Sequence, residues 1–292
     1  MISQPECLVC MLNQARNTAK IATSDDKDRN EILNRTAQLI QQTDLQLSPA
    51  ENSKPVYDIV AQVTGIQDPY YELKRQSNEE AMRLLPKLRQ IIDESEDRIA
   101  TALHIAVAGN IIDLGIGHTY DLSRDVDIIL RTTFKIDHTL AFKKELIPGR
   151  KLLMLGDNSG EIVFDLLLIE ELIKASISVT YCVKSRPIIN DATMADARTV
   201  GLDSLVPVIE TGSGHIGINF NHAGDEFLQV FAAANIILAK GHGNFETCHN
   251  REENIYFLLK AKCNVVAGEL GIEKGAIVFK NSRINDRLTT TV

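Results

Sequence analysis

Apolar residues recur at three- and four-residue spacing through most of the first 146 positions of the chain. This spacing is typical of amphipathic helices and predicts helices over residues 7–21, 28–42 and 77–108. Polar or proline-bearing connectors, such as residues 46–49, separate them. No convincing strand pattern occurs in this region, so we expect an all-helical N-terminal part.

From residue 148 onward, short apolar runs alternate with helical stretches. The predicted strands lie at residues 151–155, 178–184, 205–209, 235–240 and 263–267. The predicted helices between them include residues 161–174 and 192–200. This alternation predicts an α/β fold with a mainly parallel, Rossmann-like sheet flanked by helices. We therefore divide the chain into a helical cap, residues 1–147, packed on an α/β core, residues 148–292, whose loops we search for a functional site.

The composition is that of a globular protein, with 44% hydrophobic and 24% charged residues. A net charge of −8 provides no general attraction for nucleic acid or for an anionic membrane surface. No apolar run reaches the roughly 20 residues that cross a bilayer, and the first residues lack the pattern of a secretory signal. Five cysteines, an odd number, do not suit a disulfide framework. We expect a cytoplasmic protein whose oligomeric state the sequence leaves open.

Ligands of parallel sheets bind beyond the carboxyl ends of the strands, so the loops after the predicted strands are the places to search. The first of these loops carries Asp157 and Asn158 between glycines. One interpretation is that Asn158 caps the following helix together with Glu161 in a capping box. The other is that Asp157 and Asn158 offer hard oxygen ligands to a cation.

Two later strand ends add charged residues to the same predicted edge. Asp191 either caps the next helix or lies beside Asp157, and two carboxylates with an amide oxygen favour Mg²⁺ or Mn²⁺ over a closed zinc site. Lys240 is either a solvated strand end or a partner for an anion, because a glycine-rich loop follows it. A metal site together with a lysine indicates phosphoryl chemistry.

Two other motifs carry weaker signals. Residues 211–217 contain GxGxxG after a strand, but no helix start follows and the next strand ends in Lys240 instead of a ribose-binding acid. We expect these glycines to form a turn or the rim of an active site. Cys7 and Cys10 form a CxxC pair without further zinc ligands, so we favour two small core residues over a metal or redox pair.

Several separated segments resemble, in order, the signature motifs of the damage-control phosphatases. These segments are residues 7–10, 109–113, 156–165, 187–193 and 240–246. The resemblance extends over essentially the whole chain and implies a helical N-terminal part on an α/β core. It also implies a metal-dependent phosphatase that acts on small metabolites, including sugar phosphates and damaged phosphometabolites. The chain departs from the family at His242, where glutamine is common, and at Phe245, where tyrosine is common.

The resemblance also implies roles for individual residues. The positions that match the metal ligands are Asp157, Asn158 and Asp191. The expected substrate-binding residues are Asn110, Asp113, Lys240, Asn244 and Glu161. The expected catalytic residues are Asp157, Lys240 and Asp113.

The expected function is hydrolysis of a small phosphorylated metabolite, a phosphoric monoester, by metal-activated water with Mn²⁺, Mg²⁺, Co²⁺ or Ni²⁺ as the cofactor. A phosphoenzyme at Asp157 is the alternative to water. Two other functions stay open. One is a Rossmann-type methyltransferase or dehydrogenase that uses the glycines of residues 211–217, and the other is a non-catalytic protein whose acidic loops hold a metal or ligand.

Overall fold

A seven-stranded sheet forms the centre of the computed structural model, which describes residues 1–108 and 131–284. The strands are β1 (Phe134–Asp137), β2 (Lys151–Leu155), β3 (Ser178–Val183), β4 (Val208–Glu210), β5 (Ile236–Lys240), β6 (Ile255–Lys260) and β7 (Ile277–Asn281). Their order is β1-β7-β6-β5-β2-β3-β4. All neighbouring strands are parallel except β6 and β7. The predicted α/β fold with a mainly parallel sheet is therefore confirmed.

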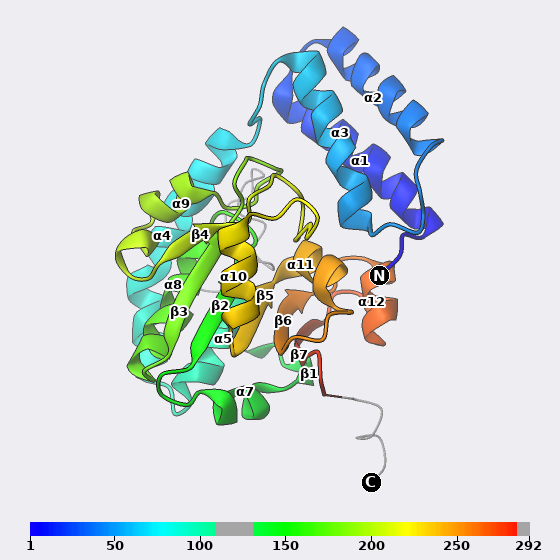
Figure 1. Ribbon diagram of the computed structural model, residues 1–292. Helices are drawn as coiled ribbons and strands as arrows, with labels where there is room; N and C mark the ends of the chain where they lie inside the picture. The colour runs from blue at the N-terminus through cyan, green and yellow to red at the C-terminus, as the bar shows by residue number, and fades with distance from the viewer. Residues whose placement is uncertain (109–130, 285–292) are drawn as a thin grey trace.

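Helices cover both faces of the sheet (Figure 1). One layer consists of α4 (Tyr71–Asp93), α5 (Arg98–Ala108), α7 (Thr139–Glu145), α8 (Glu161–Lys174) and α9 (Met194–Thr199). The other layer consists of α10 (Asp225–Ala233), α11 (Gly241–Cys248) and α12 (Asn264–Leu270). Met154 belongs to the first hydrophobic cluster, whereas Leu153 and Leu155 belong to the second. Burial of both faces is why β2 is a continuous apolar run instead of an alternating one.

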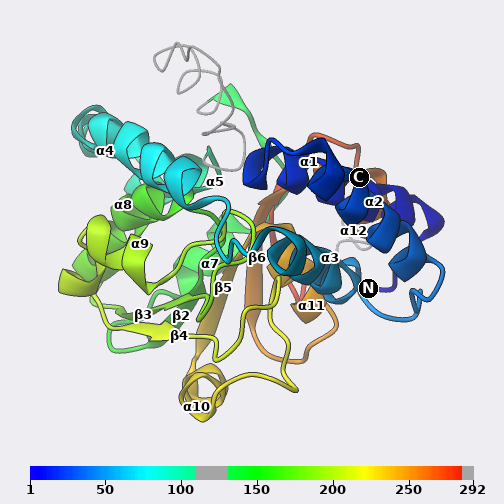
Figure 2. The same ribbon diagram turned by 90° about the horizontal axis from the view of Figure 1, so that it is seen from above.

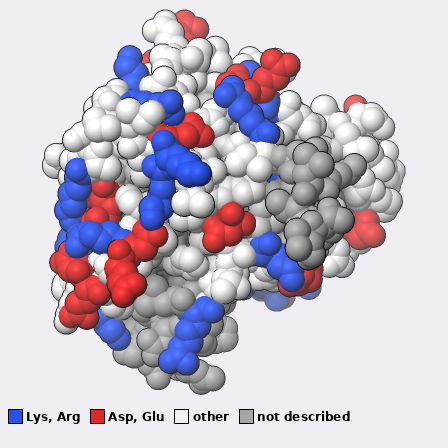
Figure 3. All heavy atoms as spheres, turned by 90° about the horizontal axis from the view of Figure 1, so that it is seen from below, with Lys and Arg blue, Asp and Glu red and all other residues white. Residues whose placement is uncertain are grey.

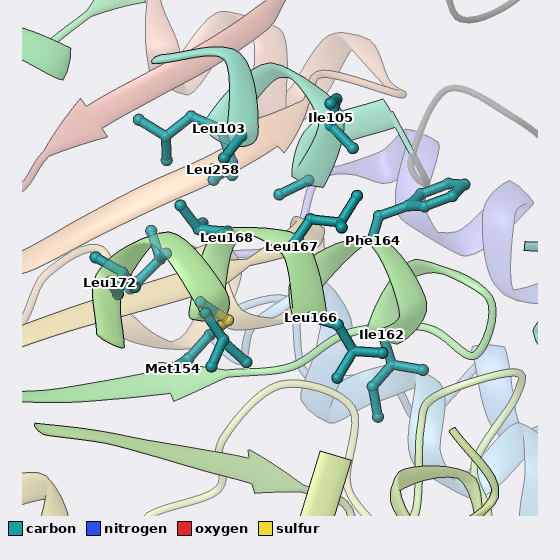
Figure 4. Packing of buried hydrophobic residues seen from close by; sticks show 14 of the residues in the cluster. Leu103, Ile105, Met154, Ile162, Phe164, Leu166, Leu167, Leu168, Leu172 and Leu258 are labelled. Carbon is teal, nitrogen blue, oxygen red and sulfur yellow. The ribbon is translucent and has the colours of Figure 1, made fainter. Parts of the chain in front are cut away.

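Helix α8 lies at the centre of the first layer and is buried along most of its length. Figure 4 shows Leu168 of α8 in the same cluster as Leu103 of α5 and Leu258 of β6. A helix that is buried nearly all round must be apolar nearly all round. Glu161 and Asp165 break this rule in α8, because both carboxylates are completely buried.

Three N-terminal helices form a separate bundle. They are α1 (Pro5–Ala22), α2 (Asp26–Ile40) and α3 (Pro49–Thr64), and they pack around a third cluster that includes Met11, Ile32 and Val56. Figures 1 and 2 show this bundle standing on α11 and α12, at the end of the sheet where β5 leads into α11. The bundle therefore covers part of the edge at which the parallel strands end.

The structure differs from the predicted elements at several places. The region before residue 147 contains a short strand, β1, which pairs with β7 inside the sheet. Residues 263–267 were predicted as a strand but lead into α12, because Sγ of Cys263 accepts a hydrogen bond from the backbone N–H of Val266 and caps the helix. The strands β6 and β7 were missed. The division of the chain at residue 147 stays a prediction.

No helix of residues 1–108 and 131–284 is long and apolar enough to cross a membrane. Figure 3 shows the face that is seen from below in Figure 1, and acidic and basic side chains lie next to one another on it. This face presents no patch of a single sign, so the net charge of −8 is not gathered there.

Candidate active site

A cavity of about 520 Å³ lies between the N-terminal helices α1 and α3 and the loops that follow β2 and β3. Asp157, Asn158 and Asp191 all line it. The two loops are joined by backbone contacts, since Ala192 N–H donates to the carbonyl of Asp157 at 2.8 Å and Asn158 and Asp191 form an isolated antiparallel bridge. The structure thus brings the three predicted metal ligands to one cavity at the carboxyl edge of the sheet.

Neither Asn158 nor Asp191 caps a helix. The N-cap of α8 is Gly160, at φ 77° and without a side-chain cap, and α9 is capped by Thr193 in a capping box with Asp196. Nδ2 of Asn158 instead donates to the Asp157 carboxylate at 2.9 Å. The capping interpretations of Asn158 and Asp191 were therefore wrong, and both side chains are available to the cavity.

Carboxylates crowd at the floor of this cavity. Burial raises the pKa of Asp157 well above its usual range, and the nearby charges of Glu161 and Asp191 raise it further. Burial also raises the pKa of Asp191 to about 6, although Lys184 opposes the shift with Nζ 3.8 Å from the Asp191 carboxylate. Negative groups that repel one another in a buried place favour binding of a cation there.

The donor set fits a hard divalent cation. Asp157, Asn158 and Asp191 offer only oxygen ligands, the kind that Mg²⁺ and Mn²⁺ prefer. Nδ2 of Asn158 now lies 2.9 Å from Oδ2 of Asp157 and 3.4 Å from Oε2 of Glu161, and a half-turn of this amide would present Oδ1 on the same side. Within the described ranges, no three His, Cys, Asp or Glu side chains form a preformed metal cage. Two carboxylates and one amide leave the other positions to water, as Mg²⁺ sites commonly do.

Lys240 lies beneath the cavity instead of within it. It is completely buried, and its Nζ donates to Oε1 of Glu161 at 2.5 Å and to Oδ1 of Asp165 at 2.7 Å. The hydroxyl of Tyr181 donates to the other oxygen of Asp165 at 2.8 Å. The interpretation of Lys240 as a solvated strand end was wrong, and its role as a phosphate ligand stays a prediction.

The strand ends around this buried network are tied together by Asn244. Lys240 is the N-cap of α11, so a helix begins where a loop was predicted. Nδ2 of Asn244 donates to the carbonyls of Lys240 at 2.8 Å and of Gly156 at 3.1 Å, which joins the end of β5 to the end of β2. Asn244 is buried and does not line the cavity, so its role in binding substrate stays a prediction.

The other predicted residues have different positions. Asn110 and Asp113 lie outside the described residues. Cys7 is buried and Cys10 is exposed, and both line the cavity, so the core interpretation holds for Cys7 alone. Burial lowers the pKa of His242 to about 4, and its Nε2 lies 2.8 Å from both the carbonyl oxygen of Lys260 and the backbone N of Lys262. The backbone contacts of its ring hold His242 in place at the wall of the cavity.

Sequence reasoning missed Asp165, Tyr181 and Lys184. Asp165 carried a signal, since it is the one charged residue in the apolar run of residues 162–169. Tyr181 carried none, because it lies in the middle of a buried strand. Its place depends on Gly156, where a Cβ atom would lie 2.5 Å from the Tyr181 hydroxyl.

The glycines of residues 211–217 form the rim of cavities at this edge. Gly212, Gly214 and His215 line a second cavity, and Ile216 lines the one described above. Helix α10 begins only at Asp225, so these glycines do not open a helix as a dinucleotide-binding turn requires.

Comparisons with known proteins agree on one family. The family model described as the damage-control phosphatase ARMT1-like domain matches residues 3–278. A damage-control phosphatase of Pyrococcus horikoshii is 34% identical over 96% of this chain and 98% of its own length, and one of Archaeoglobus fulgidus is 33% identical over 94% and 98%. An uncharacterized protein of Methanocaldococcus jannaschii is 33% identical over 93% of both chains. The crystal structure of a DUF89 family protein from P. horikoshii superposes with a TM-score of 0.89 at 34% identity, over 97% of this chain and all of that one.

Proposed function

Because the chain belongs to the ARMT1-like damage-control phosphatase family, we propose that it is a metal-dependent phosphatase of small phosphorylated metabolites. Its substrates would be sugar phosphates or damaged phosphometabolites. Two relatives of nearly the same length are named damage-control phosphatases. The observation that supports the proposal most strongly is that Asp157, Asn158 and Asp191 line one cavity. Burial and the negative charges of neighbouring carboxylates raise the pKa of Asp157 there, so a cation would stabilise its charged form.

The three oxygen donors Asp157, Asn158 and Asp191 would hold one divalent cation, Mn²⁺, Mg²⁺, Co²⁺ or Ni²⁺. Such an ion, when bound, polarises a phosphoryl oxygen and lowers the pKa of water so that water becomes the nucleophile.

The positive side chains of the chain have separate tasks in this proposal. Lys240 neutralises Glu161 and Asp165 and so holds Glu161 beside Asn158. To contact phosphate, Lys240 would have to leave these carboxylates. Lys262 lines the cavity directly, and its charge already acts on both Asp157 and Asp191. Lys262 is therefore better placed than Lys240 to offset the charge of a bound phosphate.

Several nearby groups are unsuited to a proton transfer role. Burial lowers the pKa of His242 to about 4, and its Nε2 already lies 2.8 Å from the carbonyl oxygen of Lys260 and from the backbone N of Lys262. Burial raises the thiol pKa of both Cys7 and Cys10, so neither is an activated thiolate. Neither Cys7 nor Cys10 is thus suited to act as a nucleophile, which supports hydrolysis by water over chemistry at these two thiols.

The test is phosphate release from p-nitrophenyl phosphate by metal-stripped protein, with and without Mg²⁺, Mn²⁺, Co²⁺ or Ni²⁺. Wild type should need added metal. Asp157→Asn should lose at least about tenfold in rate or metal affinity, because it removes a metal ligand. Asp203→Asn is the matched control, since Asp203 is an exposed aspartate far along the chain in the short helix Leu202–Ser204. Phosphate release that responds neither to metal nor to Asp157→Asn would overturn the proposal.

A further inference from the structure

A second cavity of about 450 Å³ lies at the same edge of the fold. Helix α3 and the loop after β3 each line both cavities. On α3, Ser53 lines the first and Lys54 the second; in the loop after β3, Asp191 lines the first and Arg186 the second. Ile189 lines both. The two cavities therefore adjoin one another across residue 189, under one helix of the N-terminal bundle.

Among the lysine, arginine and carboxylate side chains that line the second cavity, Arg186 is the one without an oppositely charged partner in the described residues. Lys54 is paired with Asp58 through contacts of 2.5 and 2.6 Å, and Asp68 is paired with Lys74 at 3.0 Å. Arg186 makes no hydrogen bond or ion pair with any residue in the described ranges. An arginine beside a polar cavity with its charge unmatched is suited to bind a carboxylate or a phosphate in a bidentate manner.

Contacts with the glycine-rich loop fix the position of Arg186. Its side chain lies along Gly214, where a Cβ atom would approach Cβ of Arg186 to 2.9 Å. Gly212 N–H donates to Oγ of Ser185 at 2.7 Å, which joins the glycine-rich loop to the arginine loop. The glycines of this loop thus make room for Arg186 at the wall of the cavity.

A second polar group in this cavity also lacks a partner. Nδ1 of His215 is buried and has no hydrogen bond among the described residues. The ring stacks on His222 with centroids 5.1 Å apart and an interplanar angle of 4°, and burial lowers the pKa of His215. A neutral imidazole with an unsatisfied nitrogen is suited to a hydroxyl group of a ligand.

Arg186 of the second cavity and Asp191 of the first are close to one another along the chain. Four residues lie between them, so their Cα atoms are at most about 18 Å apart.

We propose that the second cavity binds the far end of the substrate and that Arg186 recognises a second anionic group there. This inference rests on the proposed function and narrows it. The preferred substrates are phosphate esters that carry a carboxylate or a second phosphate at the end remote from the metal site, with hydroxyl groups between the two.

The experiment compares glucose-derived phosphate esters that carry different groups at the end remote from the 6-phosphate. Glucose 6-phosphate has a neutral far end, 6-phosphogluconate has a carboxylate there, and glucose 1,6-bisphosphate has a second phosphate. p-Nitrophenyl phosphate has no group that reaches the second cavity. The enzymes are wild type, Arg186→Gln, Arg186→Lys and, as a matched control, Arg198→Gln on the exposed side of α9.

Wild type should have a lower KM for at least one doubly anionic substrate than for glucose 6-phosphate. Arg186→Gln should raise that KM about tenfold or more, the usual effect of losing a charged hydrogen bond, with kcat little changed. Arg186→Lys should recover part of the loss. KM for p-nitrophenyl phosphate should stay the same in all four proteins, which a general loss of structure would not allow.

The experiment distinguishes failure of the proposed phosphatase function from failure of the second-anion site. If p-nitrophenyl phosphate shows no metal-dependent hydrolysis, the proposed function itself is wrong. If it is hydrolysed but wild type does not prefer a doubly anionic substrate, or Arg186→Gln affects all substrates equally, the second-anion site is wrong and the phosphatase remains.

Discussion

Gly241 lies directly against Asp157, because a Cβ atom at residue 241 would be 1.9 Å from Oδ2 of that carboxylate. Residue 241 also has φ 76°, in the left-handed region that favours glycine. The first residue after β5 thus fixes where the carboxylate after β2 can lie, and the position allows no side chain.

Gly241→Ala should therefore weaken metal activation in addition to destabilising the fold through backbone strain. Gly201→Ala is the matched control, since Gly201 has φ 77° and nothing lies within 4 Å of its Cβ position. Both variants should lose about 1–2 kcal/mol of unfolding free energy from the left-handed conformation. Only Gly241→Ala should also shift the metal concentration for half-maximal phosphatase activity, by at least about tenfold. Equal metal activation in the two variants would contradict the assigned contact.

Lys240→Met should strongly destabilise the protein, because it leaves Glu161 and Asp165 buried without their counter-charge. Removing one partner from a buried ion pair typically costs about 3–5 kcal/mol. Arg89→Met is the comparison, since Arg89 pairs with Glu170 on the surface, where such pairs contribute about 0–1 kcal/mol. Urea unfolding measures both losses, and similar values for the two variants would show that Lys240 does not hold the network together.

Glu246 should make stability depend on pH. Burial raises its pKa from 4.5 to about 7, so the folded protein binds a proton there that the unfolded chain has released. This contribution is fully present below about pH 4.5 and is lost as pH rises to about 7. Between these pH values, Glu246→Gln should reduce the slope of the unfolding free energy against pH by up to about 1.4 kcal/mol per pH unit. Glu226→Gln, at an exposed residue of α10, should leave the slope unchanged, and an unchanged slope in Glu246→Gln would contradict the assignment.

Asp157→Asn should affect the stability of the metal-free and metal-loaded protein in opposite ways. Without metal it should unfold at the same or a higher temperature than wild type, because it relieves repulsion with Glu161 and Asp191. Added Mn²⁺ should raise the melting temperature of wild type, since binding at 100 times Kd adds about 2.7 kcal/mol. The variant should lose most of this gain. Differential scanning fluorimetry with and without Mn²⁺ tests both statements, and a full metal-induced shift in Asp157→Asn would contradict them.

The sequence was most informative where burial leaves a simple pattern. The runs at residues 151–155 and 235–240 read as strands because both faces of the sheet are covered. Residues 263–267 misled because a short apolar run with two valines does not distinguish a strand from a helix, and the deciding contact is the cap at Cys263. The four residues of β1 are too few to show a pattern.

The site residues that directly follow strands could be predicted, because the carboxyl ends of parallel strands lie at one edge of the sheet. Asp157 and Asp191 follow strands that turned out to be neighbours, so their meeting followed from the topology. The burial of Lys240 was not predicted, although Glu161 and Asp165 are four residues apart and so share one face of α8. The wall contributed by α1 and α3 was beyond reach, because helical periodicity does not say where a bundle packs on a sheet.

The most direct test of the account is the rate of phosphate release as a function of Mn²⁺ concentration, measured for wild type and Asp191→Asn on p-nitrophenyl phosphate. A metal site at Asp157, Asn158 and Asp191 predicts no rate without metal, a saturating activation curve for wild type, and a midpoint at least about tenfold higher for Asp191→Asn. Superimposable curves for the two proteins, or a full rate in the absence of metal, would contradict it.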